Sequence, residues 1–547
     1  TANGVFSIGE VLLDAHEAGI KIVKKYTKYL PKIKCPKSVL INEEKSAAVW
    51  FMPQGASRKL KMKTWLDFQN DVKVNDVELA AQEGYESVEH TKRYTTLGMA
   101  TDQGKLSNIN GLAVLSDSLN LPIPDVGTTT FRPPYQPISL GSIGGDARGE
   151  LFKPIRKTSI HNWIDQNGAI WEPVADWRRP YCFLRGSESI KEAVEREIVN
   201  TRNNCGILDA STLGKILVTG PDAGKFLDMI YTNKMSSLHV GKCRYGLMCG
   251  ENGFLSDDGV VARLSEDSYL CHTTSGGSDR IHAHMEEWLQ TEWWDWKVHT
   301  LNLTEQFSQI AIVGPNARTV LAKMGVEGID ISQEGLPFMS FLEGKISDIP
   351  ARIFRISFSG ELSYEIAIPA KRAQEFWDAA LSAGSEFGIM PYGTEALHVM
   401  RAEKGFIMIG DETDGTVIPQ DLGLNWAISK KKEDFIGKRA QLREFLQFED
   451  RWRLVGLKTV DPTVILPDGI YAVDEKLNKY GHKNMIGRVT SSYYSPTLER
   501  SIALALVVKG PERMDEVINF ANLDGTITKA VICDPVFYDK EGKSQNA

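Results

Sequence analysis

The sequence has 547 residues, too many for one hydrophobic core, and this length suggests about three or four domains. Its 42% hydrophobic and 24% charged residues are typical of a globular protein. Its seven cysteines are scattered and include no C-x-x-C pair, which argues against disulfides and against a zinc site. We therefore expect a reducing compartment, the cytoplasm. The net charge of -8 without a long basic block argues against a nucleic-acid partner, and the apolar run at residues 502–508 is too short to cross a membrane.

The first 62 residues predict a helix followed by a linker. Within residues 1–24, apolar residues from Ile8 to Ile22 recur at helical spacing and predict an amphipathic helix. Because nothing precedes this helix that it could pack against, we expect a piece of a longer polypeptide or contact with another subunit. Residues 25–62 are basic and interrupted by proline, which predicts a linker.

Residues 63–112 predict a small helical unit. Asn75 or Asp76 is a suitable N-cap for a helix with apolar positions from Val77 to Ala81. Residues 113–150 are rich in proline and glycine and therefore predict an extended connection to the rest of the chain.

From residue 151 to residue 433, strand and helix patterns alternate. A clear amphipathic helix is predicted near residues 187–206, with Ser187 as its N-cap and Gly206 as its stop. Two strands, at 214–220 and 309–314, each run into a proline-led helix start, which suggests a local internal duplication.

The C-terminal part, residues 434–547, contains several apolar strand patterns separated by turn residues. This arrangement predicts a small all-β unit, and a barrel is the form that we expect.

Two adjacent carboxylates, Asp257 and Asp258, interrupt an apolar run in "NGFLSDDGVV", residues 252–261. One interpretation is a hairpin turn, since Asp-Gly is a common turn signal. The other is a working carboxylate on a strand. Because a strand sends successive side chains to opposite faces, only one of the two could then line a pocket, unless the strand bulges.

Other polar residues also allow two interpretations. Glu365 alternates with apolar residues in a predicted strand, so it lies either on the solvent face or in a cavity, where a carboxylate could accept the paired N–H groups of an amino-pyrimidine ring. Arg401, in a predicted helix, is by itself typical of a salt bridge. His282 and His284 are two residues apart on a predicted helix and point to different sides, which argues against a shared metal ion.

Several motifs resemble the folate-binding family of the glycine-cleavage T-protein, the aminomethyltransferases. They are "NGFLSDDGVV", "FSGELSYEIAIP", "RAEKG" and "IPQDLGLNW". "TTFRPPYQP", "DASTLGKI" and "DPVFYDKEG" are in turn similar to the α subunits of heterotetrameric sarcosine oxidases, as is the segment at 67–105. The resemblance implies an α+β, multidomain protein, in which a small helical domain precedes a T-protein-like fold at 151–433 and a β-barrel at 434–547.

For the N-terminal part, the resemblance implies that residues 1–24 are the remnant of a dinucleotide-binding domain. Residues 63–112 resemble the small helical [2Fe–2S] domain of bacterioferritin-associated ferredoxins. Asp67, Gln69 and Asp102 stand where that family has cysteines, so we expect a domain without a cluster. In the sarcosine oxidases this surface lies near a flavin mononucleotide (FMN) bound by the β subunit, and Arg93 and Thr95 are the expected phosphate donors.

The resemblance also implies the site residues. Asp258, the second aspartate of the pair, is expected to be catalytic, and Glu365 to bind the pterin ring. Thr273, Arg401 and Tyr245 are the other expected folate contacts. The chain departs from the T-proteins at two positions, where it has Phe358 in place of a tyrosine and Leu397 in place of an arginine.

The implied function is transfer of the methylene group of oxidised sarcosine to tetrahydrofolate, which gives methylene-tetrahydrofolate and glycine. The implied partners are a flavoprotein β subunit and small subunits, with FAD and NAD in the wider complex and no metal at this site. Three alternatives remain open: the corresponding subunit of N-methylglutamate dehydrogenase, a lone aminomethyltransferase served by a lipoyl carrier protein, and a non-catalytic scaffold.

Overall fold

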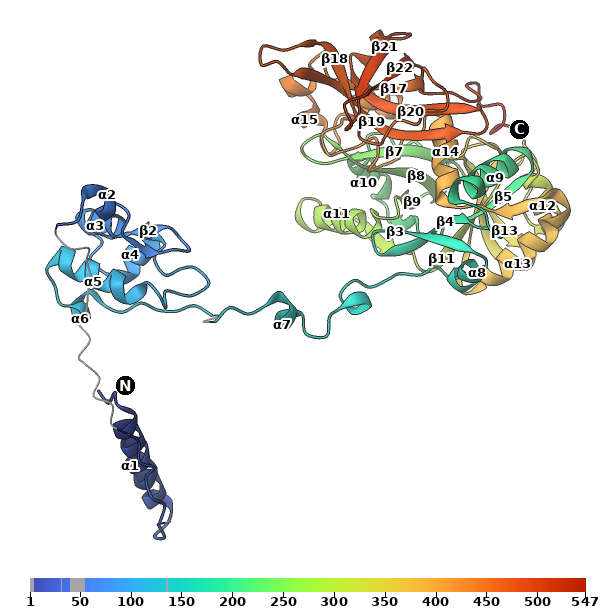
Figure 1. The fold of residues 1–547 in the computed structure, drawn as a ribbon. Helices are drawn as coiled ribbons and strands as arrows, with labels where there is room; N and C mark the ends of the chain where they lie inside the picture. The colour runs from blue at the N-terminus through green and yellow to red at the C-terminus, as the bar shows by residue number, and fades with distance from the viewer. Residues whose placement is uncertain (1–3, 31, 40–54, 134–135) are drawn as a thin grey trace. The chain divides into compact units, whose positions relative to one another are not determined.

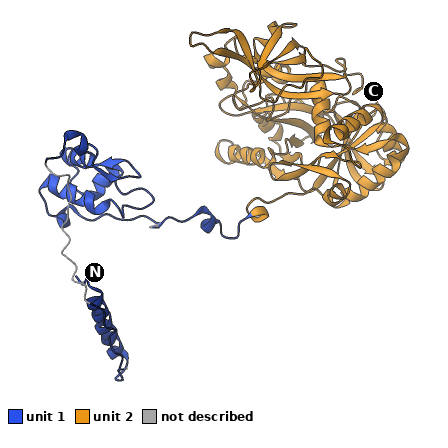
Figure 2. Ribbon diagram, viewed as in Figure 1, with its two compact units in different colours: residues 1–148 blue, residues 149–547 orange. Residues whose placement is uncertain are grey.

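The computed structural model describes residues 4–30, 32–39, 55–133 and 136–547. It divides the chain into two compact units, residues 1–148 and residues 149–547 (Figure 2). Parts of the predicted remnant at 1–24 and of the predicted linker at 25–62 lie outside the described residues. Among the residues that are described, no helix combines the length and the apolar character needed to span a membrane.

The first unit begins with helix α1, Ile8–Tyr26, which forms as predicted (Figure 1). Ser7 caps it, and Glu10 bonds back to the backbone of Ser7 in a capping box. None of its residues is buried, and Ile8 and Ile22 expose 66% and 58% of their surface. The apolar stripe read from the sequence is therefore present and uncovered.

The rest of the first unit is a small helical domain around one core. Its elements are α2 (Arg58–Lys61), β1 (Trp65–Asp67), β2 (Val72–Lys73), α3 (Val74–Gln82), α4 (Val88–Thr95), α5 (Asn108–Leu119) and α6 (Ile123–Val126). The predicted N-cap of α3 is wrong: Asp76 is already inside the helix and accepts a hydrogen bond from Lys73 N at 2.7 Å. The predicted extended connection also begins too early, because Val114, Leu115 and Val126 are buried in the core of this domain. After it come α7 (Leu140–Gly144) and η1 (Gly149–Leu151).

The second unit contains a mixed sheet of seven strands, an antiparallel sheet of five strands and a barrel. The seven-stranded sheet has the order β12-β13-β14-β15-β11-β5-β16, and the five-stranded sheet has the order β10-β6-β9-β8-β7. All pairs are antiparallel except β16 with β5. The strands of the first sheet are β5 (Cys205–Asp209), β11 (Phe307–Val313), β12 (Val326–Glu327), β13 (Ser340–Ile346), β14 (Ile349–Arg355), β15 (Ser363–Pro369) and β16 (Ile389–Pro391). Those of the second are β6 (Gly214–Thr219), β7 (Cys243–Cys249), β8 (Leu255–Ser265), β9 (Ser268–Thr273) and β10 (His299–Asn302).

Helices and one hairpin complete this part. They are α8 (His161–Gln166), β3 (Ala169–Val174), β4 (Trp177–Phe183), α9 (Ile190–Asn203), α10 (Ala223–Ile230), α11 (Ser278–Thr291), α12 (Ala317–Met324), α13 (Ala373–Gly384) and α14 (Thr394–Glu403). The two predicted strand–glycine–helix units are confirmed as β6–α10 and β11–α12. Gly220 and Gly314 join them with φ angles of 126° and 116°, a backbone conformation that favours glycine.

Helix α9 is confirmed, but its predicted ends are wrong. The N-cap is Ser189 rather than Ser187, because Ser189 Oγ accepts a hydrogen bond from Glu192 N at 3.3 Å. Gly206 lies in β5 and not at the end of the helix. A β-carbon there would come within 2.5 Å of Thr201 Oγ1, so packing rather than helix termination requires glycine.

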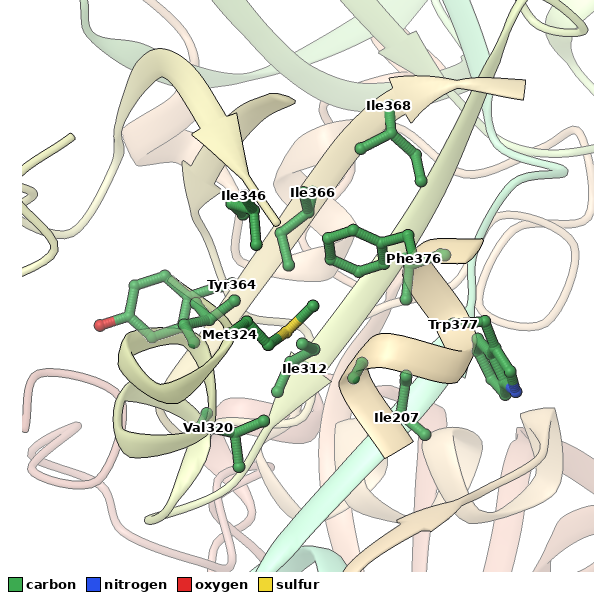
Figure 3. Packing of buried hydrophobic residues seen from close by; sticks show 14 of the residues in the cluster. Ile207, Ile312, Val320, Met324, Ile346, Tyr364, Ile366, Ile368, Phe376 and Trp377 are labelled. Atoms are coloured by element: carbon green, nitrogen blue, oxygen red, sulfur yellow. The ribbon is translucent and has the colours of Figure 1, made fainter. Parts of the chain in front are cut away.

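The large apolar side chains of β15 pack into the core of the seven-stranded sheet, and this packing fixes which face of the strand each residue occupies. Tyr364, Ile366 and Ile368 face α12 and α13 (Figure 3). They pack with buried residues that include Ile207, Ile312, Val320, Met324, Ile346, Phe376 and Trp377. Because successive residues of a strand alternate, Ser363, Glu365 and Ala367 point to the opposite face.

The C-terminal strands close into a barrel, as predicted. Its order is β17-β20-β19-β18-β21-β22, with β17 (Trp452–Thr459), β18 (Tyr471–Leu477), β19 (Lys483–Ser495), β20 (Arg500–Val508), β21 (Val517–Ala521) and β22 (Ile527–Cys533). The barrel begins later than residue 434. Residues 434–451 carry α15 (Lys438–Gln441) and η6 (Glu444–Leu446), and Ile436 packs with the core of the five-stranded sheet.

Candidate functional site

A cavity of about 1230 Å³ lies inside the second unit. Its walls come from the five-stranded sheet, the seven-stranded sheet, helix α14 and the barrel strand β19. Tyr245, Asp258, Thr273, Glu365 and Tyr493 line it, although they are spread over some 250 positions of the sequence. Its size exceeds the range of about 300–1,000 Å³ that is usual for small-molecule sites. The cavity can therefore hold a large ligand together with a small one.

The two adjacent aspartates lie on one continuous strand, so the hairpin-turn interpretation is wrong. Strand β8 pairs with β7 through both of them, Met248 with Asp257 and Leu247 with Asp258. Asp258 lines the cavity, whereas Asp257 is wholly buried on the other side. Asp257 accepts hydrogen bonds from Asp258 N at 2.8 Å and from Thr274 N at 3.3 Å. The alternative of a single cavity carboxylate is the one that the structure supports.

Two glycines allow this arrangement. A β-carbon on Gly259 would come within 1.9 Å of His272 O, so glycine is what lets β8 and β9 approach closely behind Asp258. A β-carbon on Gly277 would come within 1.8 Å of Asp257 Oδ2. Gly277 caps α11, and its missing side chain leaves room for the buried carboxylate at that end of the helix.

Asp258 has the environment of a proton-transfer group. Burial raises its pKa to about 7, and the negative charge of Asp257 adds to this effect. Tyr245 Oη donates a hydrogen bond to Asp258 Oδ2 at 2.5 Å, which works in the opposite direction. A carboxyl group with a pKa near 7 can both take up and release a proton at neutral pH.

Tyr245 is itself covered by Trp426, a residue that sequence reasoning quoted in a motif but did not single out. The two rings stack with centroids 5.7 Å apart, and Trp426 lines the cavity while exposing 66% of its surface. A flat, half-exposed aromatic ring at the edge of a cavity is suited to stacking on a ring of a ligand.

Glu365 points into the cavity and not to solvent, which decides between the two interpretations of its strand. Burial raises its pKa to about 7, although a hydrogen bond from Gln309 and the charge of Lys215 lower it. Thr273 ends β9 on the neighbouring wall, where its hydroxyl donates to Thr274 O at 3.1 Å. The cavity therefore has polar groups on two opposing sheets.

Arg401 does not line the cavity, and its expected direct contact with folate is not supported by its position. The side chain is 0% exposed and forms ion pairs with Glu412 at 2.8 Å and Asp411 at 2.9 Å. It also donates to Ser491 Oγ of the barrel at 2.7 Å. Helix α14 aims Arg401 at the barrel, and Arg401 reaches the cavity wall through its partners Asp411, Phe406 and Tyr493.

The two positions at which the chain departs from the T-proteins, Phe358 and Leu397, both line the cavity. Phe358 stacks with Phe406, with ring centroids 6.2 Å apart. Sequence reasoning also missed Glu395, which lines the cavity next to His398, at 3.8 Å between Oε2 and Nδ1. Their spacing of three residues on one helix was the available signal.

The remaining predicted residues lie elsewhere. In the first unit, Arg93 forms an ion pair with Glu89 at 3.0 Å, and Thr95 Oγ1 donates to Thr91 O at 2.7 Å, both within α4. Asp67, at a position where the ferredoxin family has cysteine, is a buried acceptor for three backbone N–H groups, those of Gln69, Asn70 and Gly98.

The two histidines of α11 turn to different neighbours. His282 Nε2 lies 3.0 Å from Thr300 Oγ1, and His284 packs edge-on against Trp288. The expectation that the two rings point to different sides of the helix is therefore confirmed.

Three protein families match successive parts of the chain. The GCVT N-terminal domain matches residues 160–432, and the glycine cleavage T-protein C-terminal barrel domain matches residues 453–539. The sarcosine oxidase A3 domain matches residues 61–147, which contain the small helical domain.

Curated relatives give the same two resemblances. The sarcosine oxidase subunit alpha of Corynebacterium sp. (strain P-1) is 44% identical over 93% of this chain and 53% of its own length, and that of Rhizobium meliloti is 42% identical over 93% and 52%. The aminomethyltransferase of Thermotoga petrophila is 30% identical over 68% of this chain and 94% of its own length. The chain therefore spans about half the length of the sarcosine oxidase subunits that it matches.

Among solved structures, the glycine cleavage system aminomethyltransferase T from Bartonella henselae superposes with a TM-score of 0.61 at 24% identity. The match covers 71% of this chain and 99% of that one. This likeness shows that the two proteins share their fold.

Proposed function

The chain belongs to the aminomethyltransferase family, the family of the glycine-cleavage T-protein, and from this premise we propose that its cavity binds tetrahydrofolate and transfers a one-carbon unit to it. The single observation that carries the proposal is the pair of cavity carboxylates, Asp258 and Glu365, on facing sheets with pKa values of about 7. In this proposal the donor is the methylene-iminium ion formed by oxidation of sarcosine. The products are methylene-tetrahydrofolate and glycine.

The proposed binding mode follows from the chemistry of the pterin ring. Its amino-pyrimidine edge presents two parallel N–H donors, and a carboxylate is the side chain that accepts such a pair. Glu365 is on the seven-stranded sheet, whereas Asp258, on the five-stranded sheet, bonds to Tyr245, which stacks on Trp426. We place the amino-pyrimidine edge at Glu365 and the reacting nitrogens towards Asp258.

Asp258 would then act as the general base and general acid of the transfer. A ring nitrogen of tetrahydrofolate attacks the CH₂ carbon of the iminium ion and gives up its N–H proton to Asp258. Asp258 passes this proton to the nitrogen of the departing amine. The neighbouring arylamine nitrogen of tetrahydrofolate, which lies outside the pterin ring, closes onto the same carbon and supplies the other proton, so that glycine leaves as the ammonium form and no proton is gained or lost overall. A positioned general base of this kind contributes about 10²–10⁴ in rate.

The charge of the cavity suits a cationic donor. Besides Asp258 and Glu365, its lining includes the carboxylates of Glu172, Asp209, Glu395, Asp411 and Asp468, which outnumber the arginines Arg179, Arg244 and Arg280. A cavity with an excess of one sign of charge in low-dielectric surroundings concentrates ions of the opposite sign. The iminium ion would therefore be held near tetrahydrofolate rather than lost to hydrolysis.

The wider assembly is also part of the proposal. We propose that this chain works with a flavoprotein β subunit, which oxidises the amine, and with small subunits, in the cytoplasm. The high identity to sarcosine oxidase α subunits and the match to the sarcosine oxidase A3 domain support this assembly. FAD and NAD would belong to other parts of the complex.

We also expect FMN to lie at the interface with the β subunit, but the side chains of this chain give this expectation little support. Arg93 and Thr95, the expected phosphate donors, both have partners inside α4. We therefore derive no step through a flavin from the residues of this chain.

The rival functions differ in partner and donor. A lone aminomethyltransferase is favoured by the nearly complete coverage of that family, but it would leave the small helical domain without a role. The corresponding subunit of N-methylglutamate dehydrogenase would use the same cavity with another amine. Copurification of a flavoprotein or a lipoyl protein distinguishes the first rival, and the amine oxidised distinguishes the second.

The proposal is tested by replacing Asp258 with asparagine in the assembled complex. We expect sarcosine oxidation to continue, while methylene-tetrahydrofolate formation falls by about 10²–10⁴ and formaldehyde takes its place. Product analysis by chromatography measures both compounds. Asp279→Asn is a matched control, because Asp279 is largely exposed and pairs with Arg156 outside the cavity. An unchanged folate product in the Asp258 variant would refute the role of this residue.

A further inference from the structure

Glu365 belongs to a buried polar layer whose other members have no role in the transfer chemistry described above. We call it the floor layer and define it as Lys215, His272, Gln309 and Glu365. Lys215 and His272 are directly opposite each other on β6 and β9 of the five-stranded sheet. Gln309 and Glu365 come from β11 and β15 of the seven-stranded sheet. Lys215, His272 and Gln309 are 1%, 5% and 0% exposed, so the layer joins the two sheets away from water.

The register of β11 and β15 brings Gln309 to Glu365. Gln309 is opposite Ala367, and Glu365 is opposite Ala311, so the two polar residues are diagonal neighbours on one face. Both residues that face them are alanines, which leave room for the longer side chains to meet. Gln309 Nε2 donates a hydrogen bond to Glu365 Oε2. One oxygen of the carboxylate is thereby fixed, and the other remains free for a ligand.

The other side of Gln309 faces His272. The Nδ1 atom of His272 lies 3.1 Å from Val260 O, so Nδ1 carries the proton and Nε2 is a bare acceptor. Burial and the charge of Lys215 lower the pKa of His272 to about 4, which keeps the ring neutral. With the amide N–H directed to Glu365, His272 Nε2 and Gln309 Oε1 both lack a hydrogen-bond partner. Leaving two buried acceptors without a hydrogen-bond donor costs free energy of folding, so this arrangement calls for an explanation.

The remaining charges around Glu365 do not fix its protonation state. Burial lowers the pKa of Lys215 to about 7, and its Nζ donates to Ser211 O at 2.9 Å and Leu213 O at 2.7 Å, not to a carboxylate. The other titratable groups packed near Glu365 and the layer are Asp209, Cys243, Tyr392 and Arg352. Burial raises the pKa of the first three, so none of those three supplies a positive charge. Arg352 acts on His272, which helps to keep that ring neutral, and its own charge is paired with Glu343.

We propose that Gln309 is a positioning residue whose amide reverses with the charge of Glu365, so that binding of a pterin is coupled to loss of one proton from this carboxyl group. When Glu365 is ionised, the amide N–H donates to Oε2, and the carboxylate accepts the N–H pair of the pterin. When Glu365 is neutral, its O–H donates to Gln309 Oε1 and the amide N–H donates to His272 Nε2. The second state gives both bare acceptors a donor. This inference rests on the proposed folate site.

The test is calorimetry of 5-formyltetrahydrofolate binding to the full chain, in buffers of different ionisation enthalpy, which counts the protons released. At pH 7 the wild type is expected to release about half a proton more than Glu365→Gln, because the carboxyl group of Glu365 has a pKa of about 7. Gln309→Leu removes the N–H donor to the carboxylate. Its proton release should rise towards one, its affinity should fall roughly tenfold, and the pH midpoint of binding should move up by roughly one unit.

His272→Phe is expected to shift proton release in the opposite direction. It removes the acceptor that stabilises the amide in the neutral state, and an aromatic ring fits there because His272 already packs edge-on against Phe354. Proton release should therefore fall below that of the wild type. This variant keeps the proposal testable if Gln309→Leu does not fold.

The controls separate this inference from the proposed function. Gln441→Leu removes another buried glutamine, whose amide binds Gly253 O outside the cavity, and should leave proton release unchanged. Gln309→Leu combined with Glu365→Gln should behave like Glu365→Gln alone. If the wild type binds the folate and neither Gln309→Leu nor His272→Phe changes proton release, the amide reversal is refuted. If the wild type does not bind the folate, the proposed function is refuted instead.

Discussion

Two regions of the second unit bury ionisable side chains in opposite ways. Around α14, two buried arginines are each held by two carboxylates: Arg202 pairs with Glu361 at 2.8 Å and Glu403 at 2.5 Å, and Arg401 pairs with Glu412 and Asp411. On the cavity walls, Asp258 and Glu365 form no ion pair with any described residue. The two arginines of the first region are held in ion pairs, whereas Asp258 and Glu365 on the cavity walls are single carboxylates.

The difference indicates which charges serve the fold and which are available for chemistry. A complete buried pair is insensitive to a ligand, but losing one partner leaves a charge stranded in a low dielectric. A single buried carboxylate instead responds by a raised pKa, and it is ready to change its charge when a ligand arrives. Arg401 thus belongs to the structural region, although its motif is similar to the folate-binding family.

The largest effect is expected when a pair in the structural region is broken. Arg401→Met strands Glu412, which is 0% exposed, and should lower the free energy of unfolding by about 3–5 kcal/mol. Chemical denaturation measures this change. Arg372→Met, which breaks an exposed pair with Glu375, should cost less than about 1 kcal/mol.

A second variant sharpens this prediction. Adding Glu412→Gln to Arg401→Met removes the stranded charge, so part of the lost stability should return. If Arg401→Met alone left the stability unchanged, the assignment of this region to the fold would be wrong.

A pH-dependent effect of opposite sign is expected next, on the cavity wall. The native state holds a proton on Asp258 that the unfolded chain releases between the ordinary pKa of 3.8 and about 7. Stability of the wild type therefore falls as pH rises through this window. Asp258→Asn removes this loss and should be more stable than the wild type by up to about 4 kcal/mol at pH 8, with little difference at pH 4. Denaturation curves at the two pH values test this, and equal curves at pH 8 would contradict it.

The smallest effect concerns the hydrogen bond that moderates Asp258. Tyr245→Phe removes the 2.5 Å donor, so the pKa of Asp258 should rise further. The pH midpoint of methylene-tetrahydrofolate formation should move up by roughly 0.5–1 unit, equivalent to about 1 kcal/mol. The product ratio of the complex as a function of pH measures it, with Tyr471→Phe on an exposed barrel strand as control. A midpoint that moves down would show that the tyrosine acts in another way.

Much of the fold was accessible from local sequence patterns. The helix at α1, the two strand–glycine–helix units and the C-terminal barrel all follow from the spacing of apolar residues and from glycine or proline at their ends. The errors concern boundaries. Ser187 and Ser189 are both plausible caps by type, and only the hydrogen bond of Ser189 to Glu192 N decides between them. Likewise, the first unit continues past residue 112 because Val126 is buried against helices that are distant in sequence.

The sequence by itself determined which residue types stand at the site and that Asp257 and Asp258 could not both face one pocket, because the alternation of a strand is a local property. Only the tertiary structure decided that Asp258 is the one in the cavity, that Arg401 faces the barrel, and that Gln309 lies beside Glu365. These three outcomes depend on how two sheets and a barrel pack. A side chain on a strand or helix has a fixed direction relative to its own backbone, but its partner is set by whichever distant element covers that face.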